Sequence, residues 1–346
     1  MKILRHIFAA LLLAVTAAGC NSTPVRQEER AMEPMNPALK ETVERRAAAL
    51  RQVLAPLEVR GAGVSLNSYR HRLLPGAEVM KNVRLLGFNR IFCRISSEAE
   101  LGEELRALII AAAGEKIPVE LVFRQGDFKH RFRGNALVRF LLPQFRRLPD
   151  LAADIVKFND SLPPEAKLAG VTVRFEPHLF TCGNGADRIP GFIYIWHEQT
   201  FGKGLDNDKL TELSIAVLRE MKKNLKGIPL KAELPDFYAA WVDEGKLTRG
   251  RPADFTGLDG VLVQCSGNRP SALVKGYLDA CAGTPCMAVV PVADHSSVRS
   301  GALRRRDWND MLRALEHFVK STRAIGCRGV VLRPLSEVGF MLLEQD

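Results

Sequence analysis

From residue 61 onward the chain repeats one pattern. A short run of alternating apolar and polar residues is followed by a turn and, in most cases, by a longer run with apolar residues every three or four positions. The short runs predict β-strands and the longer runs predict helices. Eight strands are predicted, at 61–67, 90–96, 117–124, 169–176, 228–234, 258–265, 286–293 and 328–333. The clearest helices are at 100–115, 207–227 and 306–326, and an amphipathic helix at 39–58 precedes the first strand.

Strands that alternate with helices predict a parallel sheet, and a count of eight predicts a closed (β/α)8 barrel of the TIM type. The alternative is an open, doubly wound sheet. That fold normally carries a glycine-rich phosphate loop after its first strand, and SLNSYRHRLLPG is not such a loop. We expect the helix at 39–58 to close the bottom of the barrel.

The fourth predicted strand shows which face of each strand points inward. Val171, Val173 and Phe175 share one face, and Thr172, Arg174 and Glu176 share the other. Because helices cover the outside of a barrel, the apolar face should point outward and the polar face inward. The same register on the other strands places these further residues inside: Ser65, Asn67, Arg94, Ser96, Glu120, Arg124, Lys231, Glu233, Gln264, Ser266 and Arg333, with Asp294 just past the seventh strand.

Charged residues inside a barrel must be paired, since burying a lone charge is costly. The five cationic residues are Arg94, Arg124, Arg174, Lys231 and Arg333, and the four carboxylates are Glu120, Glu176, Glu233 and Asp294. One interpretation is a self-neutralising network that fills the barrel. The other is a ligand site at the carboxyl ends of the strands, where enzymes of this fold hold their active sites.

The long segment after the fourth strand, residues 177–207, favours a ligand site. It contains the rings of Phe180, Phe192, Tyr194, Trp196, His197 and Phe201. Aromatic rings stack on sugar faces and bury apolar ligand surface, although FIYIW also fits an extra strand packed on the barrel. We expect Asn67, Arg94, Arg124, Arg174, His178, Trp196, Tyr238, Gln264 and Arg333 to contact the ligand.

The first twenty residues predict the location of the protein. A short basic start, MKILRH, leads into the apolar run IFAALLLAVTAA, which ends in the sequence AAGC at Cys20. This resembles a bacterial lipoprotein signal peptide, and an ordinary secretory signal is the alternative. The resemblance implies cleavage before Cys20, palmitate-type lipidation of that cysteine and, because Asn21 follows it, sorting to the outer membrane. The predicted organisation is a signal peptide (1–19), a flexible lipidated tether (20–38) and one barrel domain (39–346).

The net charge of +10 falls to +8 when Lys2 and Arg5 leave with the signal peptide. In a cell-envelope protein this charge favours anionic lipid headgroups or acidic polysaccharides as partners over nucleic acid. Residues 128–149 interleave six lysines and arginines with four phenylalanines, and part of this segment should be an amphipathic helix. We expect a monomer without a cofactor.

Six cysteines follow Cys20, with irregular spacing and no C-x-x-C pair, so no zinc site is predicted. Cys93 and Cys265 fall on apolar strand faces and should be core residues. An oxidising envelope permits disulfides. We expect any disulfide to involve Cys286, with Cys327 and Cys281 as competing partners.

Phe175-Glu176-Pro177 ends the fourth strand, where many retaining (β/α)8 glycoside hydrolases have Asn-Glu-Pro. The chain therefore resembles these enzymes at the level of the fold, with Glu and Pro matched and Asn not. The resemblance implies that Glu176 is the acid/base and that the nucleophile lies near Asp294, with Glu233 as the other choice. Arg174 beside Glu176 would lower the pKa of Glu176, which suits a nucleophile better than an acid.

Two other functional classes are compatible with the pattern. A non-catalytic glycan-binding or envelope-assembly lipoprotein would keep the barrel and the aromatic segment without the chemistry. A hydrolase of anionic substrates, such as a phosphodiesterase, would use the arginines as clamps. Such an enzyme usually needs metal ligands, and only His178 and His295 are near the predicted mouth.

Overall fold

The computed structural model describes residues 37–65, 76–95, 100–124, 151–175, 207–234, 245, 251–265, 286–293, 303–304, 308–335, 338–339 and 342. The strands are β1 Val59–Ser65, β2 Arg90–Arg94, β3 Val119–Arg124, β4 Gly170–Arg174, β5 Leu230–Leu234, β6 Gly260–Gln264, β7 Cys286–Ala293, β8 Leu303–Arg304 and β9 Gly329–Arg333. The helices are α2 Pro37–Leu54, α3 Gly76–Leu85, α4 Glu103–Gly114, α7 Asn207–Asn224 and α10 Trp308–Ala324, with 3₁₀ turns η3 Pro164–Ala166 and η6 Pro252–Phe255.

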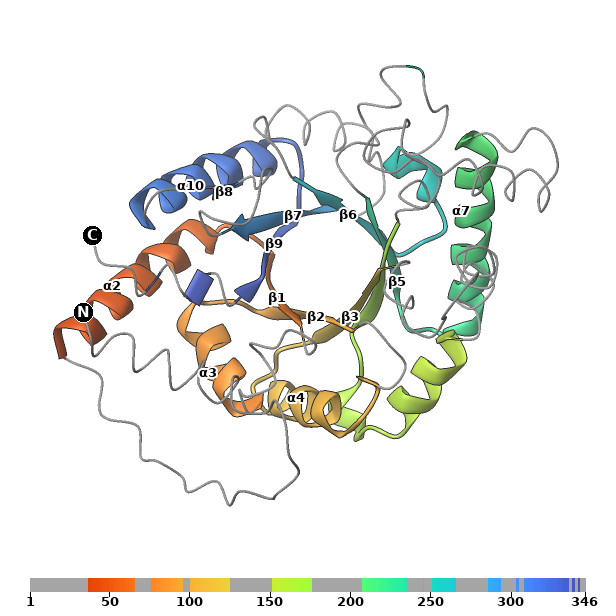
Figure 1. The fold of residues 1–346 in the computed structure, drawn as a ribbon, viewed down its shortest axis with the longest axis horizontal. Helices are drawn as coiled ribbons and strands as arrows, with labels where there is room; N and C mark the ends of the chain where they lie inside the picture. The colour runs from red at the N-terminus through yellow and green to blue at the C-terminus, as the bar shows by residue number, and fades with distance from the viewer. Residues whose placement is uncertain are drawn as a thin grey trace, which may run out of the picture.

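Eight parallel strands close into a barrel, so the predicted (β/α)8 fold is confirmed (Figure 1). Strands β1 to β7 pair in chain order, and β9 pairs with both β7 and β1 to complete the ring. Every pairing is parallel. All eight predicted strands are present, several of them shorter than predicted at one or both ends. The two-residue strand β8, which pairs with the end of β7, was not predicted.

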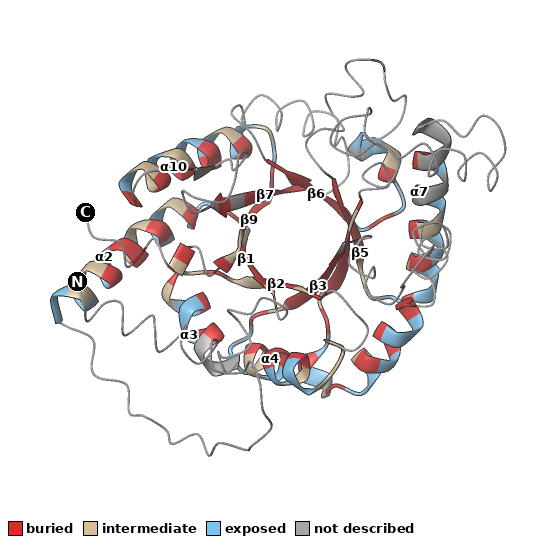
Figure 2. Cartoon of the chain, viewed as in Figure 1, coloured by how far each residue is buried: buried red, intermediate tan, exposed pale blue. Residues whose placement is uncertain are grey.

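The interior and the exterior of the barrel have separate apolar clusters. Val171, Val173 and Phe175 on β4 belong to the large cluster between the strands and the surrounding helices. Phe92, Val122, Leu262, Met287, Val289 and Val331 form a small cluster of their own. Figure 2 shows the strands largely buried, with intermediate residues at the ends of several of them, and the helices buried mainly on the side that faces the barrel. The predicted register is therefore confirmed, since the outward faces are the apolar faces that the helices cover.

Helix α2 fills the outer position between β9 and β1, where the last helix of a regular barrel would lie. It packs beside α10 (Figure 1), and the Arg46 guanidinium donates a hydrogen bond to the carbonyl of Leu342, 3.1 Å away. On its other side, Arg51 donates to the carbonyl of Leu85 at the end of α3. The expectation that this helix closes the bottom of the barrel is wrong, because its apolar stripe packs into the side of the helical ring. It also begins two residues before the predicted start of the domain.

The predictions that Cys286 forms a disulfide and that Cys93 and Cys265 are core residues are confirmed. Cys286 is disulfide-bonded, whereas Cys93, Cys265 and Cys327 are buried free thiols. Cys327 is therefore not the partner of Cys286, although its thiol lies 3.8 Å from the Cys286 carbonyl. Burial and the nearby charge of Glu100 raise the pKa of Cys93 to about 12, so this thiol stays protonated. No helix among the described residues is both long and apolar enough to cross a membrane.

Candidate functional site

Four polar side chains meet inside the barrel at the carboxyl ends of the strands, and we name them the mouth cluster: Arg174, Glu233, Gln264 and Arg333. Arg333, the last residue of β9, donates to both carboxylate oxygens of Glu233, at 3.0 and 2.8 Å. Gln264 donates its amide N–H to Glu233 and accepts a hydrogen bond from Arg174 at 3.1 Å. The Nε of Arg174 lies 3.9 Å from Oε1 of Glu233, the oxygen that also accepts the 2.8 Å hydrogen bond from Arg333.

The mouth cluster joins opposite sides of the barrel. Arg174 ends β4 and Arg333 ends β9, which are four steps apart in the ring of eight strands. Glu233 on β5 lies between them in the ring, so Arg333 must extend across the interior to reach it. Charge-assisted, bidentate bonds of this kind fix the orientation of a guanidinium plane as well as its position.

Glu233 is ionised at neutral pH. Burial would raise its pKa, since only 1% of the side chain is exposed. The charges of Arg333 and Arg174 and the hydrogen bonds from Arg333 and Gln264 act in the opposite direction, and the net effect is a pKa below the ordinary value. A carboxyl group in this state accepts hydrogen bonds and holds cations, but it has no proton to give to a leaving group.

A second cluster lies at the amino ends of the strands, and we name it the base cluster: Arg90, Glu120, Thr172 and Lys231. The fully buried carboxylate of Glu120 accepts from Arg90 and from Lys231, both at 2.5 Å. The hydroxyl of Thr172 lies 3.4 Å from its other oxygen. This buried carboxylate holds two cations and a hydroxyl together at the amino end of the barrel. Its removal would leave the two cations without a counter-charge and would destabilise the fold.

Apolar residues separate the two clusters on individual strands. On β2, Phe92 lies between Arg90 and Arg94, and on β3, Val122 lies between Glu120 and Arg124. The polar interior is therefore divided into two clusters along the barrel. Glu120 and Lys231 do not contribute to the carboxyl end, because each is only the second residue of its strand.

The predicted ligand residues fall into two groups. Arg174, Glu233, Gln264 and Arg333 are brought together as predicted, and Arg94 shares the inner face of β2 with Phe92. Arg124 ends β3, so four strands of the barrel end in arginine. The other predicted residues lie outside the described residues: Asn67, Glu176, His178, Trp196, Tyr238, Asp294, His295 and Cys20, together with the segments 128–149 and 177–206.

Sequence reasoning missed Arg90 and two glycines that shape the interior. Arg90 was readable from the alternation of β2, since positions 90, 92 and 94 share one face. A side chain at Gly63 would meet the Cβ of Arg333 at 2.8 Å, and one at Gly61 would meet the ring of Phe92 at 2.7 Å. These glycines give Arg333 and Phe92 the space to enter the barrel, and no local pattern in the sequence marks them. The described part of the chain also holds no group of three His, Cys, Asp or Glu residues placed to bind a metal.

Comparison with known proteins finds no matching family model and no matching curated protein. Solved structures with a similar chain course include a β-1,4-D-mannanase from Cryptopygus antarcticus, at 13% identity, 83% of this chain, 91% of that chain and a TM-score of 0.48. A broad-specificity endoglucanase from Clostridium acetobutylicum has 10% identity, with 82% and 89% of the two chains covered and a TM-score of 0.41. A phosphoenolpyruvate phosphomutase from Streptomyces platensis subsp. rosaceus has 17% identity, with 85% and 82% covered and a TM-score of 0.39. Likeness at this level does not assign a reaction to this chain.

Proposed function

We propose that this chain is a lipid-anchored envelope protein that binds an acidic carbohydrate at the carboxyl end of its barrel. The observation that carries the proposal is the state of Arg333. Its side chain is 24% exposed, while the carboxylate that holds it is 1% exposed. Two of the five N–H donors of its guanidinium bond Glu233, and the other three have no partner among the described residues. Glu233 therefore holds the Arg333 guanidinium in one orientation, and no described residue uses its three remaining N–H donors.

Arg174 adds a second cation within reach of the same ligand. Its side chain is 20% exposed, and it lies on the strand opposite Arg333. The Arg174 Nε and the Arg333 Nη2 lie 3.9 and 2.8 Å from one Glu233 oxygen, so these two nitrogens are at most 6.7 Å apart. One carboxylate, sulfate or phosphate group, or two on adjacent atoms of a sugar, can contact both guanidinium groups.

Two features of the sequence support a carbohydrate as the carrier of that acidic group. The segment that follows β4 contains aromatic residues, Trp196 among them, which suit stacking on sugar rings. The lipoprotein-like start of the chain, with Cys20 as the lipidated residue and outer-membrane sorting, would place the domain among envelope polysaccharides.

The state of Glu233 favours binding over cleavage by this residue. A general acid must carry a proton, and a nucleophile must reach the anomeric carbon; Glu233 is ionised, buried and held by Arg333. If the protein cleaves glycosides, the catalytic pair is Glu176 with Asp294, and Glu233 positions the arginines. The alternative is a glycan-binding or envelope-assembly protein that uses the same cluster without chemistry.

Calorimetric titration tests the binding proposal with an oligogalacturonide and a neutral oligosaccharide of equal length. The acidic ligand should bind more tightly. Arg174→Ala should weaken that binding about 10- to 100-fold, because a charge-assisted contact contributes about 1.5–3 kcal/mol. Trp196→Ala should also weaken it. Arg84→Ala, at the exposed end of α3, is the matched control and should leave affinity unchanged. Equal affinity of wild type and Arg174→Ala for the acidic ligand would contradict the proposal.

An assay of glycan cleavage distinguishes a glycoside hydrolase from a non-catalytic glycan-binding protein. Glu176→Gln is expected to abolish release of reducing ends while keeping affinity within about threefold if the protein is a hydrolase. If no glycan that binds is cleaved by the wild type, the non-catalytic form holds. Mass spectrometry of the mature amino terminus tests the anchor separately, and Cys20→Ser should release the protein from the membrane fraction.

A further inference from the structure

The described residues use one edge of the Arg333 guanidinium. Its Nη1 donates to Oε2 of Glu233 at 3.0 Å, and its Nη2 donates to Oε1 at 2.8 Å. A guanidinium group has a second edge, on which the Nε–H and the outer N–H of Nη2 lie parallel to each other. No described residue accepts a hydrogen bond from that edge. Arg333 therefore presents two parallel donors in addition to those that hold Glu233.

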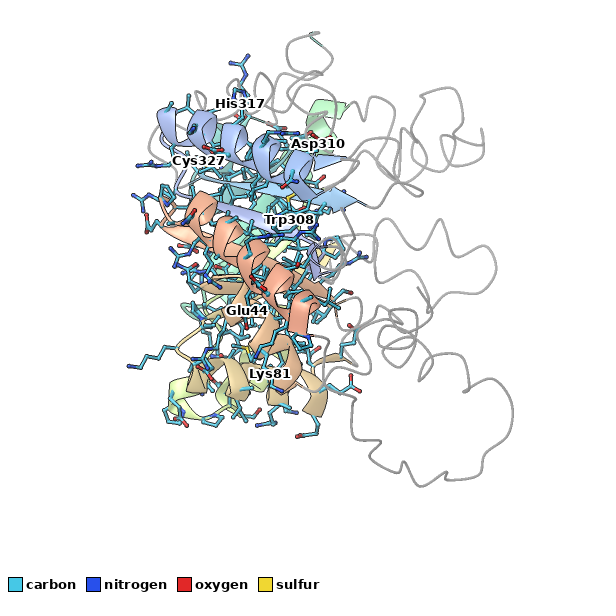
Figure 3. All side chains as sticks on the ribbon, turned by 90° about the vertical axis from the view of Figure 1, so that its left-hand side faces the viewer. Glu44, Lys81, Trp308, Asp310, His317 and Cys327 are labelled. Atoms are coloured by element: carbon cyan, nitrogen blue, oxygen red, sulfur yellow. The ribbon has the colours of Figure 1, made fainter. Side chains whose placement is uncertain are left out.

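This second edge is open to solvent. None of the Arg333 nitrogens is a buried donor that lacks an acceptor. Since no described residue accepts from its Nε, that N–H contacts solvent, in agreement with the 24% exposure of the side chain. Figure 3 shows Cys327, two residues before β9 begins, at the end of the barrel opposite Trp308. Arg333 ends β9 and so lies toward the Trp308 end, where a ligand can reach it from the mouth.

Arg333 is held at both ends of its side chain. A Cβ at Gly63 would lie 2.8 Å from Cβ and 2.9 Å from Cγ of Arg333, so the backbone of β1 packs directly against the arginine stem. At the other end, the buried carboxylate of Glu233 fixes the guanidinium plane through two hydrogen bonds. The second edge is therefore presented in one orientation before a ligand arrives, and a ligand that matches it loses less entropy on binding.

The charge at this edge suits a ligand group with a single negative charge. The guanidinium groups of Arg174 and Arg333 and the carboxylate of Glu233 leave the mouth cluster with one excess positive charge. The second edge is on the side of Oε1, which Arg174 approaches to 3.9 Å, so both cations act on a group bound there. A phosphate monoester carries a charge of about −1.5 to −2 at pH 7 and would over-compensate this mostly buried cluster. A carboxylate or a sulfate ester would neutralise it.

Geometry separates these two monoanions. A carboxylate carries its charge on two oxygens in one plane, which match two parallel N–H donors. A sulfate ester spreads the same charge over three oxygens around a tetrahedral sulfur, so each oxygen is a weaker acceptor and the three cannot all lie in the plane of the guanidinium. An edge that is fixed in one plane therefore favours the carboxylate.

From these observations we infer that the second edge of Arg333 is a carboxylate subsite, and that the acidic carbohydrate is recognised through the carboxylate of a uronic acid. This inference rests on the proposed function, because it specifies the acidic group of the same ligand.

Binding of matched sugars to the wild-type protein tests the subsite. A series of oligosaccharide backbones is titrated by calorimetry, each backbone as the uronic acid, as its methyl ester and with a sulfate ester at the same carbon. For every backbone that binds, the uronic acid should bind at least about tenfold more tightly than the sulfate ester, and the uncharged methyl ester should bind most weakly. The Nε–H resonance of Arg333, in protein with isotopically labelled arginine, should shift when the uronic acid is added.

Arg333→Lys keeps the positive charge and removes the planar edge. It should weaken uronic-acid binding about tenfold or more and reduce the preference over the sulfate ester to within about threefold. Arg323→Lys makes the same change at an exposed position in the last turn of α10 and should bind like the wild type. The wild-type comparison and the Nε–H resonance decide the question even if Arg333→Lys does not fold.

The outcomes separate this inference from the proposed function. A sulfate ester that binds the wild type as tightly as the matching uronic acid overturns the carboxylate subsite and leaves the proposed function in place. Binding of the uronic acid without a shift of the Arg333 Nε–H resonance does the same. Absence of binding by every acidic form overturns the proposed function and this inference with it.

Discussion

Glu233 is a buried anion whose proton affinity the barrel has set. Its pKa lies below the ordinary value for Glu, so its ionised form contributes stability above about pH 4.3, the usual value in an unfolded chain. That contribution is lost as the pH falls through the lower, folded pKa. The same bonds that orient Arg333 for a ligand therefore make the fold sensitive to acid.

We predict that Glu233→Gln lowers the free energy of unfolding by about 3 kcal/mol at pH 7, because it removes the charge from a buried pair and leaves the cations. The gap to the wild type should narrow as the pH falls below about 4.3, because the unfolded wild-type chain then takes up a proton at Glu233 that the folded chain does not. Urea unfolding at pH 7, 5, 4 and 3 measures this. Glu103→Gln, at an exposed position, should follow the wild type within about 0.5 kcal/mol at every pH. A constant gap from pH 7 to pH 3 would show that folding does not lower the pKa of Glu233.

The thiols offer a second test at the scale of single residues. Cys93, Cys265 and Cys327 are buried and free, and burial raises the pKa of Cys93 and of Cys327. We predict that iodoacetamide leaves these three thiols unmodified in the folded protein and modifies them in 6 M guanidinium without a reductant. Cys286 should become reactive only after reduction. Peptide mass spectrometry under the three conditions measures this, and a Cys286–Cys327 disulfide would contradict the prediction that Cys327 carries a thiol.

At the scale of elements, strand β1 needs glycine at two positions, because a side chain there would collide with neighbouring residues inside the barrel. Gly61 and Gly63 face the interior, and Gly63 makes room for Arg333. We predict that Gly63→Ala destabilises the fold by about 1–3 kcal/mol, because its Cβ would lie 2.8 Å from that of Arg333 and the arginine must shift. The shift should weaken binding of the acidic ligand as well. Gly114→Ala is the control: no atom lies within 4 Å of the added methyl group, and alanine at the end of α4 should stabilise by up to about 1 kcal/mol. Thermal unfolding and calorimetry compare the two variants.

Helix α2 should be part of the cooperative fold. Leu50 is fully buried on its inner side. Leu50→Ala should cost about 2–5 kcal/mol, as expected for a buried leucine. Ile110→Ala removes a side chain from a position that is 43% exposed and should change stability much less. Denaturant unfolding followed by tryptophan fluorescence and by circular dichroism should show one shared transition for Leu50→Ala. An early separate loss of helix would mean that α2 is only loosely attached.

At the scale of the whole molecule, the sequence predicted the barrel because strand-like alternation recurs eight times and runs with helical periodicity separate several of the strands. The inward direction of Arg174, Glu233 and Arg333 followed from the same alternation, since helices require apolar partners such as Val171 and Val173. The division into two polar clusters was not predicted. It depends on how far along its strand each residue lies, and Glu120 and Glu233 look alike until the strands are aligned. The slot that α2 occupies was also not predicted, because an amphipathic helix packs equally well under the barrel or beside it.

The closure of the ring by β9 has a consequence for how the protein is made. Val59 on β1 pairs with Gly329 on β9, so the seam joins residues 270 positions apart, from the first strand to the last. Contacts between such distant positions form late and slow the folding of a chain. A nascent chain that has not yet released β9 exposes unpaired edges of β1 and β7, which invite association with other chains. Closure of the barrel therefore has to wait until β9 is available, and a chain that is complete before it begins to fold avoids this hazard.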